Sequence, residues 1–76
     1  MYVGNLDLQT NDSELLQAFE AFGDVASAII MRSYPTGQGR GYGFVEMKDE
    51  RQARAAVNAL DGSPLRGRAL FVRESR

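Results

Sequence analysis

The order of apolar patterns along the chain predicts an α+β fold: a ferredoxin-like βαββαβ sandwich whose four-stranded antiparallel sheet carries two helices on one face. Four segments have the alternation or the β-branched content of strands. Two others have apolar residues at helical spacing behind capping residues, and each follows a strand, which gives two similar βα units. Because 76 residues suffice for one small core, we expect residues 1–76 to form a single domain.

The first strand is predicted in "MYVGNL", at the start of the chain. Met1 and Val3 alternate there with Tyr2 and Gly4, and the segment ends at Asn5. Since nothing in this sequence precedes the strand, we expect Tyr2 to be held loosely.

The first helix is predicted at about residues 12–22. Asn11 and Glu14 have the spacing of a capping box, and Gly23 is suited to the C-terminal end. The apolar stripe of this helix consists of Leu15, Leu16, Ala18, Phe19 and Phe22.

The second and third strands are predicted at residues 25–33 and 40–47, as a hairpin. "VASAIIMRS" is apolar and rich in β-branched residues, and "YPTGQG" supplies the proline and glycines of a loop. "RGYGFVEM" follows as the partner strand, with alternating side chains on its two faces.

The second helix and the last strand complete the order. Asp49 is suited to cap the helix, with Gln52 again at capping-box spacing, and "DG" ends it. Its apolar stripe consists of Ala53, Ala56, Val57 and Leu60. The last strand is expected at about residues 68–73, "RALFVR".

Alternation along these strands assigns side chains to the two faces of the sheet. The helix-covered face is expected to take Met1, Val3, Ala28, Ile30, Gly43, Val45, Met47, Leu70 and Val72, with glycine permitting close approach of a helix. The open face is expected to take Tyr2, Ile29, Met31, Arg40, Tyr42, Phe44, Glu46, Phe71 and Arg73. An open face with four aromatic rings and flanking arginines predicts a binding surface.

Composition excludes most enzyme classes. The chain has no histidine and no cysteine, which removes the usual zinc sites, disulfides, thiol nucleophiles and Ser-His-Asp relays. No apolar run is long enough to span a bilayer, and the start lacks the pattern of a signal peptide. We therefore expect a non-catalytic, monomeric protein inside the cell, in the cytoplasm or, if the source is eukaryotic, in the nucleus, without metal, cofactor, small-molecule substrate or membrane.

The net charge of −1 averages over an uneven distribution. Residues 1–31 hold five acidic residues and no basic residue, whereas every lysine and arginine comes later. If the early acids lie on a helix behind the sheet, the overall acidity says little about the open face.

Two motifs in these strands carry a family resemblance. "MYVGNL" is similar to the hexamer signature of the RNA recognition motif, and "RGYGFVEM" is similar to its octamer signature. The chain as a whole resembles that family, and in particular its small bacterial single-domain members, described as glycine-rich or cold-induced RNA-binding proteins. Met47 departs from the octamer, whose last position is aromatic, but this position points into the core.

The resemblance implies a function and a set of site residues. It implies that Tyr2 and Tyr42 stack on successive bases of single-stranded RNA, that Phe44 contacts sugars and that Arg40 pairs with phosphate. Phe71 would extend the stacking surface, with Arg73 beside it. The expected RNA-binding set is completed by Asn5, Met31 and Arg32, the last as a clamp together with Tyr34.

Two other functions stay open at this point. Single-stranded DNA offers the same base faces, and nothing in the sequence identifies a group that reads the 2′-hydroxyl. Some relatives bind a tryptophan-bearing peptide through an acidic first helix, but "SPLRGRALF" lacks the Arg-x-Phe loop that those relatives use. An acylphosphatase-like enzyme would need a basic anion-binding loop after "MYVGNL", which is absent.

Overall fold

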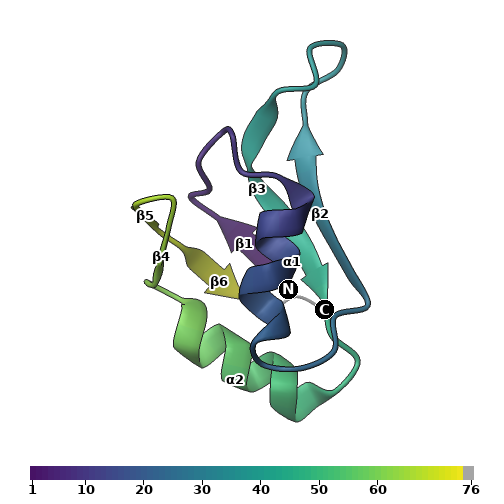
Figure 1. Ribbon diagram of the computed structural model, residues 1–76, viewed down its shortest axis with the longest axis vertical. Helices are drawn as coiled ribbons and strands as arrows, with labels where there is room; N and C mark the ends of the chain where they lie inside the picture. Colours follow the sequence, from purple (N-terminus) through teal and green to yellow (C-terminus); the bar gives the residue numbers. More distant parts are fainter. Residues whose placement is uncertain (75–76) are drawn as a thin grey trace.

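The computed structural model describes residues 1–74, so the last two residues of the expected domain lie outside the described residues. The elements follow in the order β1 (Tyr2–Gly4), α1 (Asp12–Glu20), β2 (Ser27–Arg32), β3 (Gly39–Glu46), α2 (Glu50–Leu60), β4 (Pro64–Leu65), β5 (Arg68–Ala69) and β6 (Phe71–Arg73) (Figure 1). The predicted α+β order is confirmed, with one small hairpin added to it.

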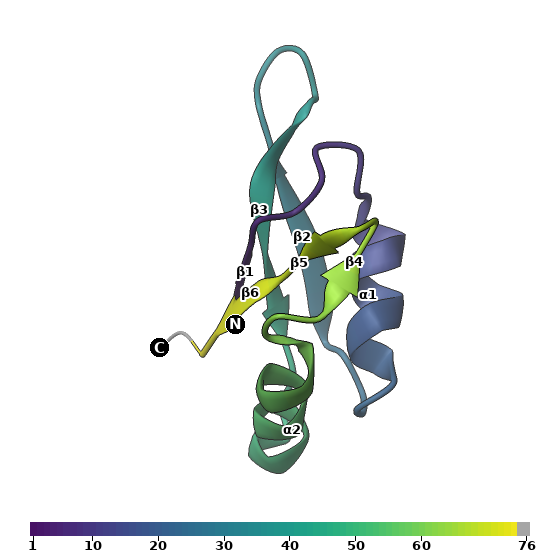
Figure 2. The ribbon, with the colours of Figure 1, turned by 90° about the vertical axis from the view of Figure 1, so that its left-hand side faces the viewer.

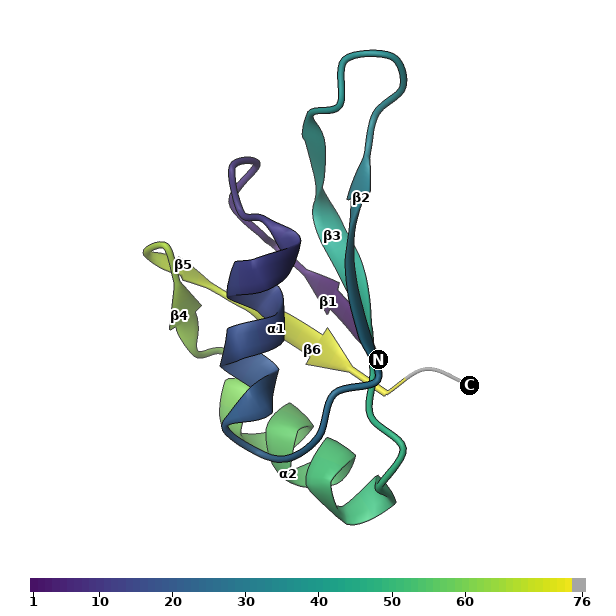
Figure 3. The same ribbon diagram turned by 45° about the vertical axis from the view of Figure 1, so that its right-hand side comes forward.

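The main sheet has the strand order β2-β3-β1-β6, and every neighbouring pair is antiparallel. Seen nearly edge-on, the sheet has α1 and α2 on one side, and no element of residues 1–74 covers the other side (Figure 2). The β2–β3 hairpin extends beyond the rest of the molecule (Figure 3). Within the described part of the chain, one face of the sheet is therefore uncovered along all four strands.

The first strand is held on both sides. β1 pairs with β3 and with β6, so that Tyr2 lies opposite Phe44 on one side and Arg73 on the other. The Val45 amide donates to the Met1 carbonyl at 2.9 Å, which extends the pairing to the first residue. The expectation that Tyr2 is loosely held is therefore wrong.

Helix α1 starts as predicted and ends earlier. The Asn11 side chain accepts from the Glu14 amide at 2.9 Å, and the Glu14 carboxylate accepts from the Asn11 amide at 3.2 Å, which completes the capping box. The helix ends at Glu20 and not at residue 22, because the Phe22 amide already bonds to the Phe19 carbonyl in a tighter turn.

Helix α2 starts behind Asp49, whose carboxylate accepts from the amides of Arg51 and Gln52 at 2.9 and 3.1 Å. The Gln52 side chain occupies the space where a Cβ on Gly23 would lie, beside the end of α1. Within residues 1–74 no hydrogen bond runs from this side chain back to Asp49, so only half of the predicted capping box forms. Neither helix in the described part of the chain is long and apolar enough to cross a membrane.

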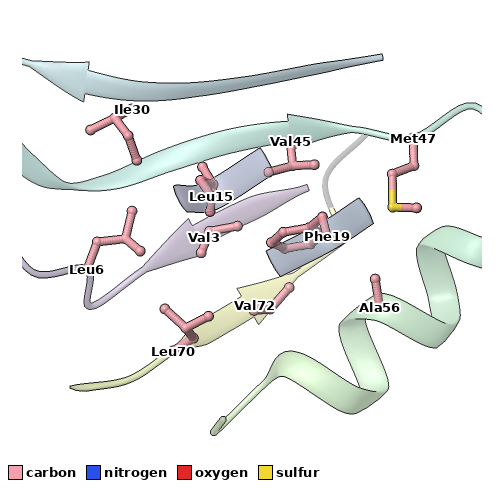
Figure 4. Packing of buried hydrophobic residues seen from close by; sticks show 10 residues of the cluster. All are labelled: Val3, Leu6, Leu15, Phe19, Ile30, Val45, Met47, Ala56, Leu70 and Val72. Carbon is pink, nitrogen blue, oxygen red and sulfur yellow. The ribbon is translucent and has the colours of Figure 1, made fainter. Parts of the chain in front are cut away.

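The core lies between the sheet and the two helices (Figure 4). It consists of Val3, Leu6, Leu15, Phe19, Ile30, Val45, Met47, Ala56, Leu70 and Val72. Met1 and Ala28 are partly buried against it, and Gly43 is buried in β3. The assignment of side chains to the helix-covered face is confirmed, and Leu6 is the addition that sequence alternation missed.

The predicted last strand at residues 68–73 is in fact two short strands. β5 pairs with β4, whereas β6 pairs with β1. Between them, the Leu70 amide donates to the Ser63 carbonyl at 2.8 Å and the Leu70 carbonyl accepts from the Gly62 amide at 2.7 Å. The chain changes pairing partner at Leu70, and this change is what breaks the strand.

The β4–β5 hairpin turns at Arg66 and Gly67, whose φ angles are +52° and +77°. Two successive positive φ angles are typical of a type I′ turn, where asparagine followed by glycine is the usual pair. Arg66 is held there by α1, because its Nε and Nη2 donate to the two Glu14 carboxylate oxygens at 2.8 and 2.9 Å. The hairpin is thereby fixed to the start of the helix.

Candidate nucleic-acid interface

Four aromatic rings from three strands meet on the open face of the sheet; we call Tyr2, Tyr42, Phe44 and Phe71 the ring cluster. The Tyr2 and Tyr42 rings are stacked, with centroids 5.9 Å apart and planes 28° apart. Tyr2 also meets Phe44 and Phe71 edge to face at 5.9 and 6.2 Å, and Tyr42 meets Phe44 at 6.1 Å. Tyr2 is therefore the centre of the cluster, because it contacts each of the other rings.

Gly4 lets the Tyr2 ring lie down on the sheet. The two residues share a face of β1, and a Cβ on Gly4 would lie 2.8 Å from the Tyr2 hydroxyl oxygen and 2.9 Å from its Cε1. The missing side chain at Gly4 thus provides the space in which the central ring sits.

The ring cluster is open to solvent. Phe44 and Phe71 expose 42% and 43% of their surface, and Tyr2 and Tyr42 are half-buried by each other. Ile29 pairs with Phe44 across β2 and β3 and exposes 53%, while Met31 on the same strand is half-buried. Three of the four strands contribute a ring, and the fourth adds aliphatic surface.

Two of the predicted arginines border the cluster. The guanidinium carbon of Arg40 lies 5.9 Å from the Tyr42 ring centroid, and that of Arg73 lies 4.0 Å from the Phe71 centroid. Arg73 also donates to Asp61 at 3.2 Å. Both cations are exposed, so a charged strand passing over the rings meets positive charge at the margins.

Two other predicted site residues contact different parts of the fold. Arg32 lies 3.7 Å from the Asp12 carboxylate of α1, in the helix layer. Asn5, with φ +59°, donates to the Ala69 carbonyl at 2.7 Å and accepts from Arg68 at 2.7 Å. In this arrangement each connects one element to another, and the structure does not bring either into contact with the ring cluster.

Glycine is required at position 43 for a different structural reason from the one expected from the sequence. A Cβ on Gly43 would lie 2.5 Å from the Ile29 carbonyl oxygen, which belongs to the neighbouring strand β2. The expectation that this glycine lets a helix approach is therefore wrong. It lets β2 and β3 approach each other, and so places Ile29 beside Phe44.

One carboxyl group beside this surface, that of Asp61, has a pKa below its ordinary value. The hydrogen bond from the Val72 amide, at 3.0 Å, lowers the pKa of Asp61, and Arg73 lowers it further. Within residues 1–74 no group of carboxylates is placed to hold a metal ion. What the arrangement provides is flat apolar surface with positive charge beside it.

Sequence reasoning missed two residues that shape the surface. Gly4 has a local signal, since it lies two positions from Tyr2 on the same strand face. Asp61 was interpreted only as part of a helix end, and its contact with Arg73 depends on how α2 packs beside β6.

The fold and the open face together define a binding domain of the ferredoxin-like class, with a ring cluster on an uncovered antiparallel sheet. The family is shown by sequence: the family model of the RNA recognition motif matches residues 1–70, and the chain belongs to this family.

Similar proteins agree with this assignment. A glycine-rich RNA-binding protein of Daucus carota is 43% identical over 75 residues, which are 99% of this chain and 48% of that protein. The crystal structure of RNA Binding Protein PG1 has a TM-score of 0.93 at 40% identity, covering 97% of this chain and 89% of that one. The solved Sxl-lethal protein/RNA complex also has a TM-score of 0.93, at 35% identity, covering 99% of this chain and 45% of that one.

The chain spans about half the length of the curated relatives it matches. The resemblance to glycine-rich members of the family is confirmed by these relatives, and the bacterial part of it stays a prediction.

Proposed function

We propose that this chain binds single-stranded RNA non-covalently on the open face of its sheet. The observation that carries the proposal is the exposed ring cluster centred on Tyr2. Every base has a π-face, so exposed rings hold unpaired nucleotides, and each stacked base contributes about 1–3 kcal/mol. A duplex keeps its base faces stacked and unavailable to such a surface.

The geometry suits a division of roles. Tyr2 and Tyr42 lie side by side at 28° and take two bases. Phe44 stands at 88° to Tyr42 and meets the sugars between them. Arg40, at the margin of the Tyr42 ring, pairs with phosphate.

Support for the remaining predicted residues is unequal. Phe71 and Arg73 lie next to the rings, and Met31 lies on the strand that borders them. Arg32 would have to leave Asp12, and Asn5 would have to leave Arg68, before either contacted RNA.

RNA is favoured over DNA by similarity. The solved Sxl-lethal complex contains RNA, and the named relatives are RNA-binding proteins. We extend the proposal to a monomeric domain of residues 1–76 that acts in post-transcriptional RNA handling inside the cell, without catalysis or a small-molecule substrate. The peptide-binding alternative is not favoured, because Glu14 and Asp12 on α1 already face Arg66 and Arg32.

The test is an amide NMR titration with randomised single-stranded RNA and with the matching DNA pool. Tyr42→Ala and Phe44→Ala are each expected to weaken RNA binding by about 1–3 kcal/mol with the fold intact. Gln17→Ala is the control, since this side chain is exposed on α1, in the helix layer on the opposite side of the sheet. Unchanged affinity in both sheet variants, or shifts confined to α1, would contradict the proposal. Equal binding of DNA would contradict its RNA part.

A further inference from the structure

We propose that the Arg73 guanidinium, and not the Phe71 ring, is the stacking surface for a further base, and that Asp61 is the residue that positions it. This inference rests on the proposed function, since it adds a nucleotide position to the same RNA site.

The Phe71 ring is already covered on one side. The guanidinium carbon of Arg73 lies 4.0 Å from its centroid, which is a stacking distance and leaves no room for a base between the two groups. Tyr2 meets the same ring edge to face at 6.2 Å and 77°. A base that follows the one on Tyr2 therefore meets the outer side of the guanidinium on this part of the sheet.

Arg73 is oriented by two acceptors. Its Nη1 donates to Asp61 Oδ2 and to the Val72 carbonyl, each at 3.2 Å. Asp61 is itself fixed, because its Oδ1 accepts from the Val72 amide at 3.0 Å. The carboxylate thus bridges the end of α2 and strand β6, and it holds the guanidinium over Phe71.

The rest of the guanidinium faces outward. Both bonds use Nη1, and the Nε and Nη2 donors have no hydrogen-bond partner among residues 1–74. The side chain of Arg73 is 55% exposed. A planar guanidinium stacks on bases as aromatic rings do, while its free N–H groups suit phosphate oxygens.

The position continues the site across the sheet. β6 lies next to β1, and Arg73 is paired with Tyr2 in the ladder between them. Stacking surfaces therefore succeed one another from Tyr42 on β3 through Tyr2 on β1 to Arg73 on β6.

The test compares a random dinucleotide RNA pool with a random octanucleotide pool, using the whole chain. Arg73→Ala is expected to weaken octanucleotide binding by about 5- to 100-fold and dinucleotide binding by a clearly smaller factor. Arg73→Lys is the matched control, because it keeps the charge and removes the plane, and it is expected not to restore the affinity. Tyr42→Ala tests the proposed RNA site itself, and it is expected to weaken the binding of both RNA pools.

Asp61→Asn keeps an acceptor for the Val72 amide and removes the charge that holds Arg73. It is expected to weaken octanucleotide binding by about 2- to 5-fold in the wild-type background and to have no effect in the R73A background, as the two residues form one unit. Stronger binding in D61N would show that Asp61 withholds Arg73 from RNA, and would overturn the positioning role. If D61N does not fold, as judged by its amide spectrum, the two Arg73 variants still decide the stacking.

Three results would overturn the proposed stacking on Arg73. These are an equal loss of affinity for both RNA pools in R73A, wild-type affinity in R73K, or no loss of octanucleotide affinity in R73A. If Tyr42→Ala also has no effect, the proposed RNA site fails; if Tyr42→Ala weakens binding, only the inference about Arg73 fails.

Discussion

Tyr2 is positioned by a residue that has no side chain, Gly4. Its ring lies across Gly4, in the space that any larger side chain at that position would fill. Because the other three rings all touch Tyr2, the arrangement of the ring cluster depends on that space.

Gly4→Ala is expected to weaken RNA binding while leaving the free energy of unfolding within about 1 kcal/mol of wild type. The new methyl group meets the far end of the Tyr2 side chain, which can rotate away, and not backbone. The loss of affinity should be smaller than that of Tyr2→Ala and should vanish when both changes are combined. Titration with the randomised RNA pool, alongside thermal unfolding, measures both quantities, and additive losses would contradict this explanation.

Gly43→Ala is the same substitution at another strand glycine, and in contrast to Gly4→Ala it is expected to lower the stability of the fold. Its Cβ would lie 2.5 Å from the Ile29 carbonyl oxygen, so the two strands would have to separate. We expect a loss of about 1–3 kcal/mol in unfolding free energy, measured by chemical denaturation. Stability equal to that of Gly4→Ala would show that β2 and β3 adjust more easily than the structure indicates.

At the scale of elements, Glu14 joins two parts of the fold, the start of α1 and the β4–β5 hairpin. It completes the capping box of α1 and receives both hydrogen bonds from Arg66, which fixes the β4–β5 hairpin to the helix. The hydrogen bond from Arg66 lowers the pKa of Glu14 below its ordinary value.

This lowered pKa predicts a direction for the pH dependence of stability. A carboxylate whose pKa is lower in the folded state stabilises the fold above its unfolded pKa, and that contribution is lost as pH falls through the folded pKa. Glu14→Gln keeps the capping box and removes the charge, so its unfolding free energy should fall less than that of wild type between about pH 6 and about pH 2. Denaturation at a series of pH values measures the difference. Asp61, whose pKa is also lowered, contributes acid sensitivity to both proteins, and identical pH profiles would exclude a role for the Glu14 charge.

The elements that sequence could predict are those whose signals are local. The capping residues Asn11 and Asp49 mark both helix starts, and alternation along the strands separates the ring cluster from the core. The β4–β5 hairpin was missed because arginine is an unusual residue for its turn, and the partner that holds it there, Glu14, lies 52 residues away.

The difference between local signals and long-range contacts also determines which parts of the candidate site could be predicted. The rings were found by alternation alone, whereas the contacts of Arg32 with Asp12 and of Arg73 with Asp61 follow from packing between distant elements. Charge at a sequence position does not indicate which neighbour will neutralise it, so arginines are the residues whose roles were least predictable.

At the scale of the whole molecule, most arginines with a described contact are engaged away from the rings. Arg66 and Arg68 contact Glu14 and Asn5, and Arg32 faces α1, which leaves Arg40 and Arg73 beside the ring cluster. Binding should therefore depend more on stacking than on charge.

The salt dependence of RNA binding tests this conclusion. Each phosphate neutralised on a single strand contributes about 0.7 to the slope of log affinity against log salt. One or two neutralised phosphates predict a slope between about 0.7 and about 1.4 in magnitude, measured by titration over a range of salt concentrations. Arg40→Ala should reduce it by about one phosphate, and a slope several times steeper would mean that basic residues off the sheet dominate.

The stacking of Tyr2 on Tyr42 also makes the protein its own optical probe. The chain has no tryptophan and three tyrosines, and two of the three lie in the ring cluster. The third, Tyr34, stands in the β2–β3 loop, so Tyr34→Phe would leave an ultraviolet emission that arises from the cluster alone. A nucleotide that stacks on these rings would quench that emission, so the occupancy of the ring cluster could be followed without an attached dye.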